Sequence, residues 1–109
     1  MAAIIVTKNT ELMQRVIDEI KTCFDPEIPV DVWELGLIYE LHLDEQSHLK
    51  IVMTLTSPNC PVAESLPAEV ENKLRLVPGV VSAELKLTFE PSWEKDMMSE
   101  VAQLELGFM

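Results

Sequence analysis

The chain has 109 residues, of which 48% are hydrophobic and 25% are charged; this composition excludes a disordered or collagen-like chain and fits one domain spanning residues 1–109. Eight Lys and Arg side chains stand against nineteen Asp and Glu side chains, so the net charge is 8 − 19 = −11. Such a surface repels a phosphate backbone, and we therefore expect no nucleic-acid binding.

The first predicted element is a helix that follows a short apolar start at residues 3–6. Asn9 or Thr10 is placed to cap this helix. Apolar residues then recur with a period of 3.6, as on one face of a helix, at Leu12, Met13, Val16, Ile17, Ile20, Cys23 and Phe24. The helix ends before Pro26, because proline disfavours helical geometry in the preceding residue, and an irregular loop follows over residues 25–34.

Two strands come next, because the apolar period changes from 3.6 to two. The first strand has one apolar face that consists of Leu37, Tyr39, Leu41 and Leu43. The second has a face formed by Leu49, Ile51, Met53 and Leu55. The polar residues 44–48 separate the two runs, which predicts an antiparallel hairpin.

A second helix is indicated up to Leu76 by apolar residues at intervals of four, namely Val62, Leu66, Val70 and Leu74. Pro67 leaves two alternatives open. Either the helix kinks at this proline, or its continuous part begins near Ser65 with Pro67 inside the first turn, where no backbone donor is needed.

The last predicted elements are a strand and a helix. Apolar and polar residues alternate over residues 81–89, and Pro91 ends this strand. Ser92 is a suitable N-cap for a final helix that Gly107 closes and that carries Trp93, Met97, Val101 and Leu104.

The predicted order is therefore α-β-β-α-β-α, which indicates an α/β (α+β) two-layer sandwich with a small three-stranded mixed sheet. The hairpin supplies two antiparallel strands. The second helix is a crossover, so we expect the third strand to lie parallel to the second.

Hydropathy and cysteine usage predict a soluble cytoplasmic protein. No apolar stretch approaches the roughly 20 residues that a membrane span needs, so we expect no membrane association. The first residues lack the basic region and cleavage site of a secretory signal. The two cysteines, Cys23 and Cys60, form no C-x-x-C pair, so the sequence encodes neither a disulfide framework nor a closed zinc site.

Cys60 is the candidate for chemistry, because it lies in a proline-bounded loop between a predicted strand and a predicted helix. Free backbone N–H groups and the helix dipole favour a thiolate at such a position, which would make Cys60 a nucleophile or a metal ligand. The alternative is a small buried hydrophobe that covers the start of the helix. Hydroxyl and amide groups occur nearby in the sequence at Thr54, Thr56, Ser57 and Asn59.

Two carboxylates in the first loop are further candidates. Asp25 and Glu27 lie two positions apart between prolines, and such a pair could hold a metal or exchange protons. The alternative is a cap or turn role. Cys23 falls on the apolar stripe of the first helix, which favours core packing over metal binding.

Three stretches together resemble one family: DPEIPV at residues 25–30, ELGLIY at residues 34–39 and MTLTSPNCP at residues 53–61. They are similar to the metal–sulfur (iron–sulfur) cluster assembly factors that include the SufT and PaaD-like proteins. VPGV at residues 77–80 and EPSW at residues 90–93 extend the resemblance, which covers about residues 10–107.

The resemblance implies a non-enzymatic role in iron–sulfur cluster assembly, in which the protein helps to deliver iron or a cluster to client apo-proteins. Cys60 would be the functional thiol and metal ligand, and Asp25, Glu27 and Asp31 would belong to the family-site loop. The cofactor would be a transient iron or iron–sulfur cluster, and the partners would be assembly proteins and clients. Asp31 stands where the family often has asparagine, and Asn59 replaces a common glycine.

Three hypotheses follow. A cluster normally takes four protein ligands, so a single Cys60 needs ligands from a client, a carrier or a second subunit in a homodimer. Alternatively, the protein is a metal-free adaptor that presents clients to the machinery by protein–protein contacts. A thiol enzyme is the weakest hypothesis, because adjacent carboxylates raise a thiol pKa and no basic partner is evident.

Overall fold

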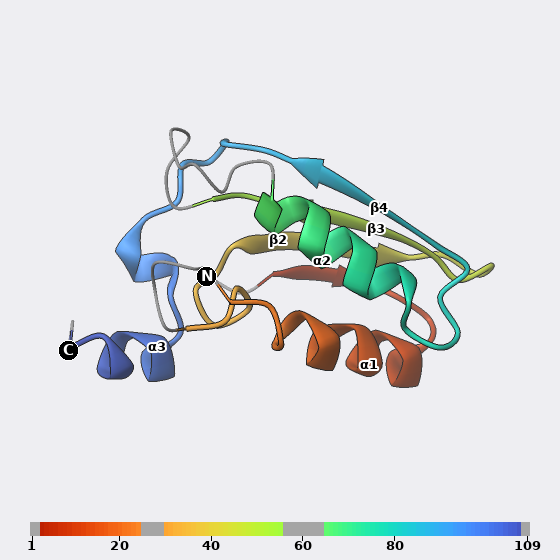
Figure 1. Ribbon diagram of the computed structural model, residues 1–109, viewed down its shortest axis with the longest axis horizontal. Helices are drawn as coiled ribbons and strands as arrows, with labels where there is room; N and C mark the ends of the chain where they lie inside the picture. The colour runs from red at the N-terminus through yellow and green to blue at the C-terminus, as the bar shows by residue number, and fades with distance from the viewer. Residues whose placement is uncertain (1–2, 25–29, 56–64, 108–109) are drawn as a thin grey trace.

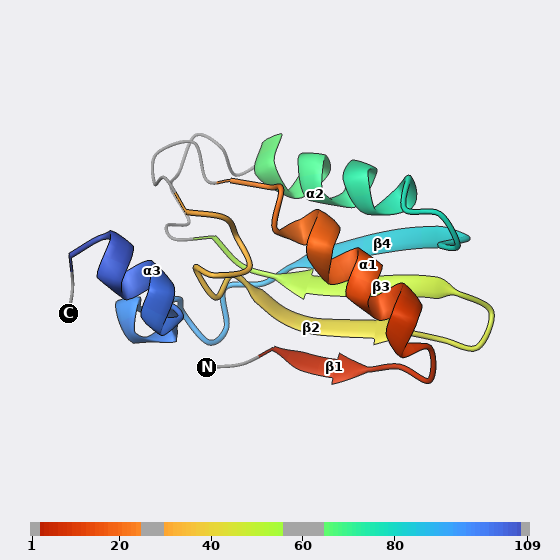
Figure 2. The ribbon, with the colours of Figure 1, turned by 90° about the horizontal axis from the view of Figure 1, so that it is seen from below.

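The computed structural model describes residues 3–24, 30–55 and 65–107. In these residues a four-stranded sheet carries helices α1 and α2 on one face (Figures 1 and 2). Its elements, in chain order, are β1 (Ile4–Val6), α1 (Thr10–Ile20), β2 (Ile38–Leu43), β3 (His48–Met53), α2 (Ser65–Arg75), β4 (Ser82–Leu87), the 3-10 helix η1 (Lys95–Met97) and α3 (Glu100–Glu105). The predicted two-layer α/β class is confirmed.

The sheet has the order β1-β2-β3-β4. The β2–β3 hairpin is antiparallel and β4 lies parallel to β3, as predicted from the crossover. The prediction of three strands was wrong, because residues 4–6 form a fourth strand parallel to β2. A three-residue strand whose side chains are all exposed has no buried face, so no alternation marks it in the sequence.

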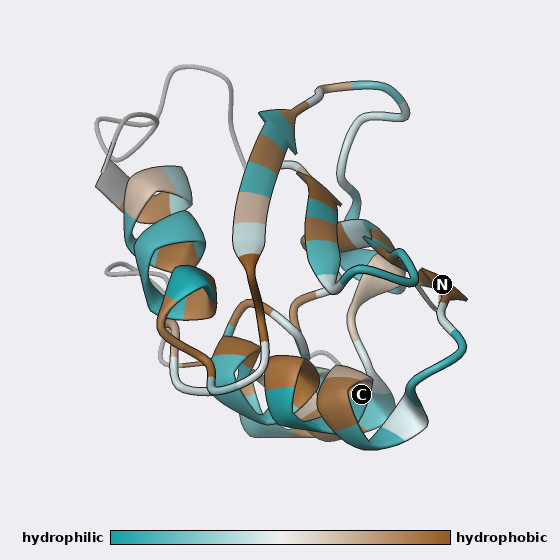
Figure 3. Cartoon of the chain, turned by 90° about the vertical axis from the view of Figure 1, so that its right-hand side faces the viewer, coloured by the Kyte–Doolittle hydropathy of each residue, from teal (hydrophilic) through white to brown (hydrophobic). Residues whose placement is uncertain are grey.

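Helix α1 has the predicted cap, since the Asn9 side chain accepts a hydrogen bond from the Leu12 backbone N–H at 3.1 Å. Its apolar stripe faces the sheet (Figure 3). The helix ends at Ile20, however, earlier than its apolar stripe suggests. Cys23, which follows the helix, is fully buried. Phe24 is 52% exposed, so the prediction that it belongs to the buried stripe was wrong.

Helix α2 runs from Ser65 among the described residues, with Pro67 as its third residue. Pro67 therefore lies in the first turn of the described part of the helix, which agrees with the alternative of a start near Ser65. The residues before Ser65, on which the choice between the two alternatives also depends, lie outside the described residues. Leu66, Val70 and Leu74 are buried, as their spacing predicts.

The end of the chain differs from the prediction. Ser92 does not begin a long helix; η1 and the six-residue α3 occupy this stretch, and Ser99 caps α3 by accepting a hydrogen bond from the Ala102 N–H at 3.1 Å. Val101 and Leu104 are 61% and 64% exposed, whereas Met98 and Ala102 are buried. The apolar spacing does not predict this arrangement, because hydrogen bonds from Trp93 and Ser99 to the turn at Glu34 and Leu35 determine how the segment packs.

The core lies between the sheet and the two long helices, and it is almost entirely aliphatic. Thr54, at the end of β3, is its buried polar residue among those described. None of the described helices has the length and apolar character needed to cross a membrane.

Candidate functional site

Most of the predicted site residues lie outside the described residues. These are Asp25, Glu27, Thr56, Ser57, Asn59 and Cys60. The structure describes Asp31, Thr54 and the residues on either side of the two segments outside the described ranges, 25–29 and 56–64. The candidate site is therefore defined by the framework that holds the ends of these segments.

One short stretch, residues 31–37, holds residues that flank both segments. At one end of it, Phe24 and Asp31 form an antiparallel bridge, and the Val32 N–H donates to the Cys23 carbonyl at 2.8 Å. At the other end, the Thr54 N–H donates to the Leu37 carbonyl at 2.8 Å. Residues 31–37 therefore connect the residues that flank the loop of Asp25 and Glu27 with the end of β3, the strand that precedes Cys60 in the sequence.

Asp31 caps the turn that this stretch forms. Its Oδ2 accepts a hydrogen bond from the Glu34 backbone N–H at 3.1 Å. Burial raises the pKa of the Asp31 carboxyl, and the nearby Glu34 charge adds to the increase, while hydrogen bonds from backbone N–H groups oppose it. Aspartate at this position therefore supplies an acceptor oxygen and also places a charge in a partly buried position.

The E-L-G part of the motif anchors the C-terminal segment. The Glu34 carbonyl accepts from the Ser99 N–H at 2.9 Å, and the Leu35 carbonyl accepts from the Trp93 indole Nε1 at 2.7 Å. Gly36 has a φ of +76°, and a Cβ there would collide with the Met97 carbonyl oxygen. The sequence pattern did not predict this role, although the glycine of the ELG motif and the tryptophan of the distant EPSW motif are its signals in the sequence.

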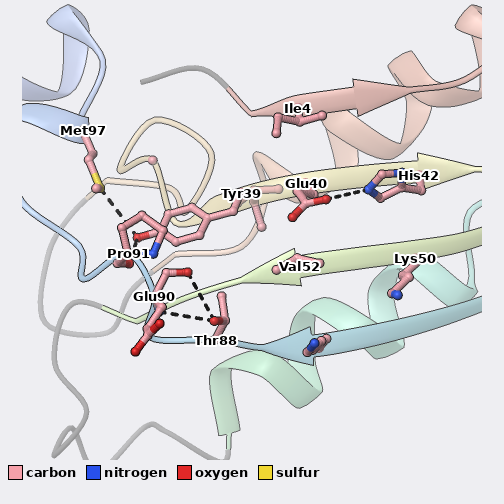
Figure 4. Close-up of a pocket in the computed structure, with 13 residues that line it drawn as sticks. Ile4, Tyr39, Glu40, His42, Lys50, Val52, Thr88, Glu90, Pro91 and Met97 are labelled. Carbon is pink, nitrogen blue, oxygen red and sulfur yellow. Dashed lines mark hydrogen bonds and ion pairs between the residues drawn. The ribbon is translucent and has the colours of Figure 1, made fainter.

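A cavity lies on the face of the sheet that α1 and α2 leave open, and several residues of β2 line it (Figure 4). The cavity has a volume of about 350 Å³. Tyr39 lines it and donates its hydroxyl to the Pro91 carbonyl at 2.7 Å, and burial raises the pKa of this hydroxyl. Glu40 and His42, neighbours on the same face of β2, pair along its wall, with 2.8 Å between Glu40 Oε1 and His42 Nε2, a contact that the sequence pattern did not predict for His42.

Cys23 is not available for chemistry at this site. Its side chain is fully buried, and its Sγ lies 3.8 Å from the Glu19 carbonyl oxygen. Burial raises the pKa of its thiol, which disfavours the thiolate that binds metals. The prediction that Cys23 packs in the core is confirmed. Within the described ranges, no group of three or more His, Cys, Asp or Glu residues is placed to hold a metal ion.

Residues 13–85 match the profile of the family described as "Iron-sulfur cluster assembly protein". The chain belongs to this family. The matched range runs from α1 into β4 and includes the acidic loop, the residues 31–37 and Cys60. The resemblance noted from the sequence motifs is thereby confirmed.

Relatives in this family are similar over nearly their whole length. An "Fe-S protein maturation auxiliary factor" from Porphyromonas gingivalis is 46% identical over 104 residues, covering 93% of this chain and 99% of the relative. The "Fe-S protein maturation auxiliary factor SufT" from Staphylococcus aureus is 36% identical over 83 residues, covering 76% of this chain and 94% of the relative.

The fold of the iron–sulfur cluster assembly family is also seen in a solved structure. The crystal structure of a "Domain of Unknown Function DUF59" from Bacillus anthracis aligns with a TM-score of 0.84 and 33% identity. The alignment covers 92% of this chain and 95% of that chain.

Proposed function

We propose that this protein is a maturation factor for iron–sulfur proteins, which helps to deliver iron or a cluster to client apo-proteins and is not an enzyme. One observation carries the proposal: the family match over residues 13–85 includes both candidate loops, and a relative named as a maturation factor is covered over 99% of its length.

Cys60 is the thiol that we propose for handling the metal. The chain has two cysteines, and Cys23 is fully buried with a raised thiol pKa. A metal ligand must be a thiolate that iron can reach, which makes Cys23 unsuitable. Cys60 follows β3 in the sequence, and hydrogen bonding of Thr54 to Leu37 holds the end of that strand beside the family motif.

A single thiolate leaves most coordination positions of a cluster to other ligands. A [2Fe–2S] or [4Fe–4S] cluster usually takes four thiolates, so we propose that Cys60 shares its cargo with a carrier, a client or a second subunit. Open positions favour transfer, because an incoming client can supply its own ligands before the cargo is released. Acidic residues of the 25–31 loop would assist as oxygen ligands or as contacts with the partner.

The test is an iron and sulfide assay on protein that has been purified and reconstituted without oxygen. We expect the parent to hold iron, Cys60→Ser to lose most of it, and the matched control Cys23→Ala to retain it. Circular dichroism of each variant establishes that it is folded. Equal iron content in the parent and in Cys60→Ser would refute the role of Cys60 as a ligand.

A metal-free adaptor is the second candidate function, and the exposed apolar and acidic surface at α3 favours it, since such a surface suits protein contacts. In this case Cys60→Ala would still capture assembly proteins or clients in a pull-down. Replacement of residues 25–31 would abolish the capture. The opposite pattern, with capture lost in Cys60→Ala alone, contradicts the adaptor.

A further inference from the structure

A groove of about 220 Å³ lies between α3 and the Phe24–Asp31 bridge, and we call it the α3 groove. Its apolar wall contains Phe24 and Val101, which are 52% and 61% exposed, and its floor contains the buried Val30 and Ala102. Leu104, which is 64% exposed, extends the apolar surface along α3. Large apolar side chains that gather in this way mark an interaction surface rather than scattered exposure.

The polar lining of the α3 groove is entirely acidic among the described residues. It consists of Asp31, Glu34 and Glu105, and no Lys, Arg or His lines the groove with them. In the part of the chain that the structure describes, none of the three carboxylates forms an ion pair. Asp31 lines the groove, and its carboxylate accepts a hydrogen bond from the Glu34 N–H, which fixes the position of this side chain.

We propose that the α3 groove binds a segment of a partner protein in which an apolar side chain is flanked by Lys or Arg. The apolar side chain would cover Phe24 and Val101, and the cations would face the three carboxylates. Removal of apolar surface from water supplies affinity, and opposite charges supply orientation and a fast association rate.

The charge of the chain argues against the other occupants. A second copy carries a net charge of −11 and would bring a like charge to an acidic surface. An acidic peptide is disfavoured for the same reason. A basic segment gains from both the local carboxylates and the field of the whole molecule.

The position of the groove relates it to the family motif. Phe24 and Val30 line it, and they are the residues that precede and follow segment 25–29 in the chain. A bound partner would therefore contact both ends of the family-site loop. That the partner is a client or an assembly protein rests on the proposed function; the binding of a basic segment does not, and it requires no iron.

The experiment uses the full-length, metal-free protein and fluorescein-labelled peptides that carry a central Leu or Phe between Lys and Arg residues. Peptides with Glu in place of each Lys and Arg are the charge controls. Fluorescence anisotropy measures the binding. We expect Val101→Asp to weaken the basic peptides by about tenfold or more, which corresponds to about 1.4 kcal/mol. The matched control Leu76→Asp, at a side chain that is 81% exposed elsewhere, should leave binding unchanged.

Charge is tested separately by Glu105→Lys, with Glu84→Lys as a control of the same charge change on β4. We expect only Glu105→Lys to weaken binding and to reduce its dependence on salt. Equal binding of basic and acidic peptides, or equal effects at the groove and control positions, would overturn the proposal. So would sedimentation that shows a dimer of the parent which Val101→Asp dissociates. Because the peptide assay uses no metal, Cys60→Ser should bind peptide normally, so failure of the groove and failure of the iron role are distinguishable.

Discussion

Trp93 donates its indole N–H to the backbone carbonyl of Leu35 at 2.7 Å, across 58 positions of the chain. Leu35 is fully buried, so water cannot replace the indole as the hydrogen-bond donor to its carbonyl. This bond fixes the C-terminal segment against the turn that precedes β2. Two motifs that are far apart in the sequence, ELGLIY and EPSW, are therefore parts of one structural unit.

Trp93→Phe should destabilise the protein because it leaves the Leu35 carbonyl unsatisfied. We expect a loss of about 1–3 kcal/mol in the free energy of unfolding, the usual cost of an orphaned buried acceptor. Urea denaturation measures it. The control is Trp33→Phe, since Trp33 also packs against the core. A loss as large in the control would assign the effect to ring volume instead of the hydrogen bond.

Gly36→Ala should cost more stability than the same change at Gly107. Both glycines have a φ of +76°, so alanine pays the same left-handed backbone penalty of about 1–2 kcal/mol at each position. Only at Gly36 would the added Cβ collide with the Met97 carbonyl, whereas nothing lies within 4 Å of a Cβ at Gly107. Thermal unfolding of the two variants gives the difference. Equal melting temperatures would show that the contact between Gly36 and Met97 relaxes without cost.

Asp31→Asn should make the stability of the protein less sensitive to pH. Burial raises the pKa of Asp31 above its value of 3.8 in the unfolded chain. The folded state therefore binds the proton more tightly, so the contribution of Asp31 to stability is complete below pH 3.8 and is lost as the pH rises through the folded-state pKa. Asparagine keeps an acceptor oxygen for the Glu34 N–H and does not titrate.

The expected outcome is that Asp31→Asn gains stability relative to the parent at neutral pH and that this gain disappears in acid. Urea denaturation at a series of pH values measures it. Glu34→Gln is the companion variant, because removal of the neighbouring charge should move the titration of Asp31 to lower pH. A constant stability difference between Asp31→Asn and the parent across this range would contradict the assignment.

Alkylation should distinguish the two cysteines. Because Cys23 is buried and its thiol pKa is raised, native Cys60→Ser protein should react with iodoacetamide only at the rate of unfolding. Denaturant should then release one reactive thiol per chain, counted by mass spectrometry. Rapid labelling of native Cys60→Ser would show that Cys23 is accessible, which would weaken the argument for Cys60 as the functional thiol.

Local pattern in the sequence determined the β2–β3 hairpin, the apolar faces of α1 and α2, and the parallel placement of β4. Each of these elements has a buried face, and a buried face imposes a period of two or 3.6 on the residues. The motifs also determined the family, because their order and spacing can be read from the sequence without knowledge of the fold. The position of Cys23 on an apolar stripe was sufficient to place it in the core.

Only the tertiary structure decided the elements that long-range contacts hold. Strand β1 exists because the edge of β2 offers backbone partners to three exposed residues. The C-terminal segment follows hydrogen bonds to Leu35 and Glu34 rather than its own apolar spacing, so Val101 and Leu104 face outward. The acidic and apolar α3 groove results from this docking. The physical reason is that a hydrogen bond between distant backbone groups leaves no periodic mark on the sequence.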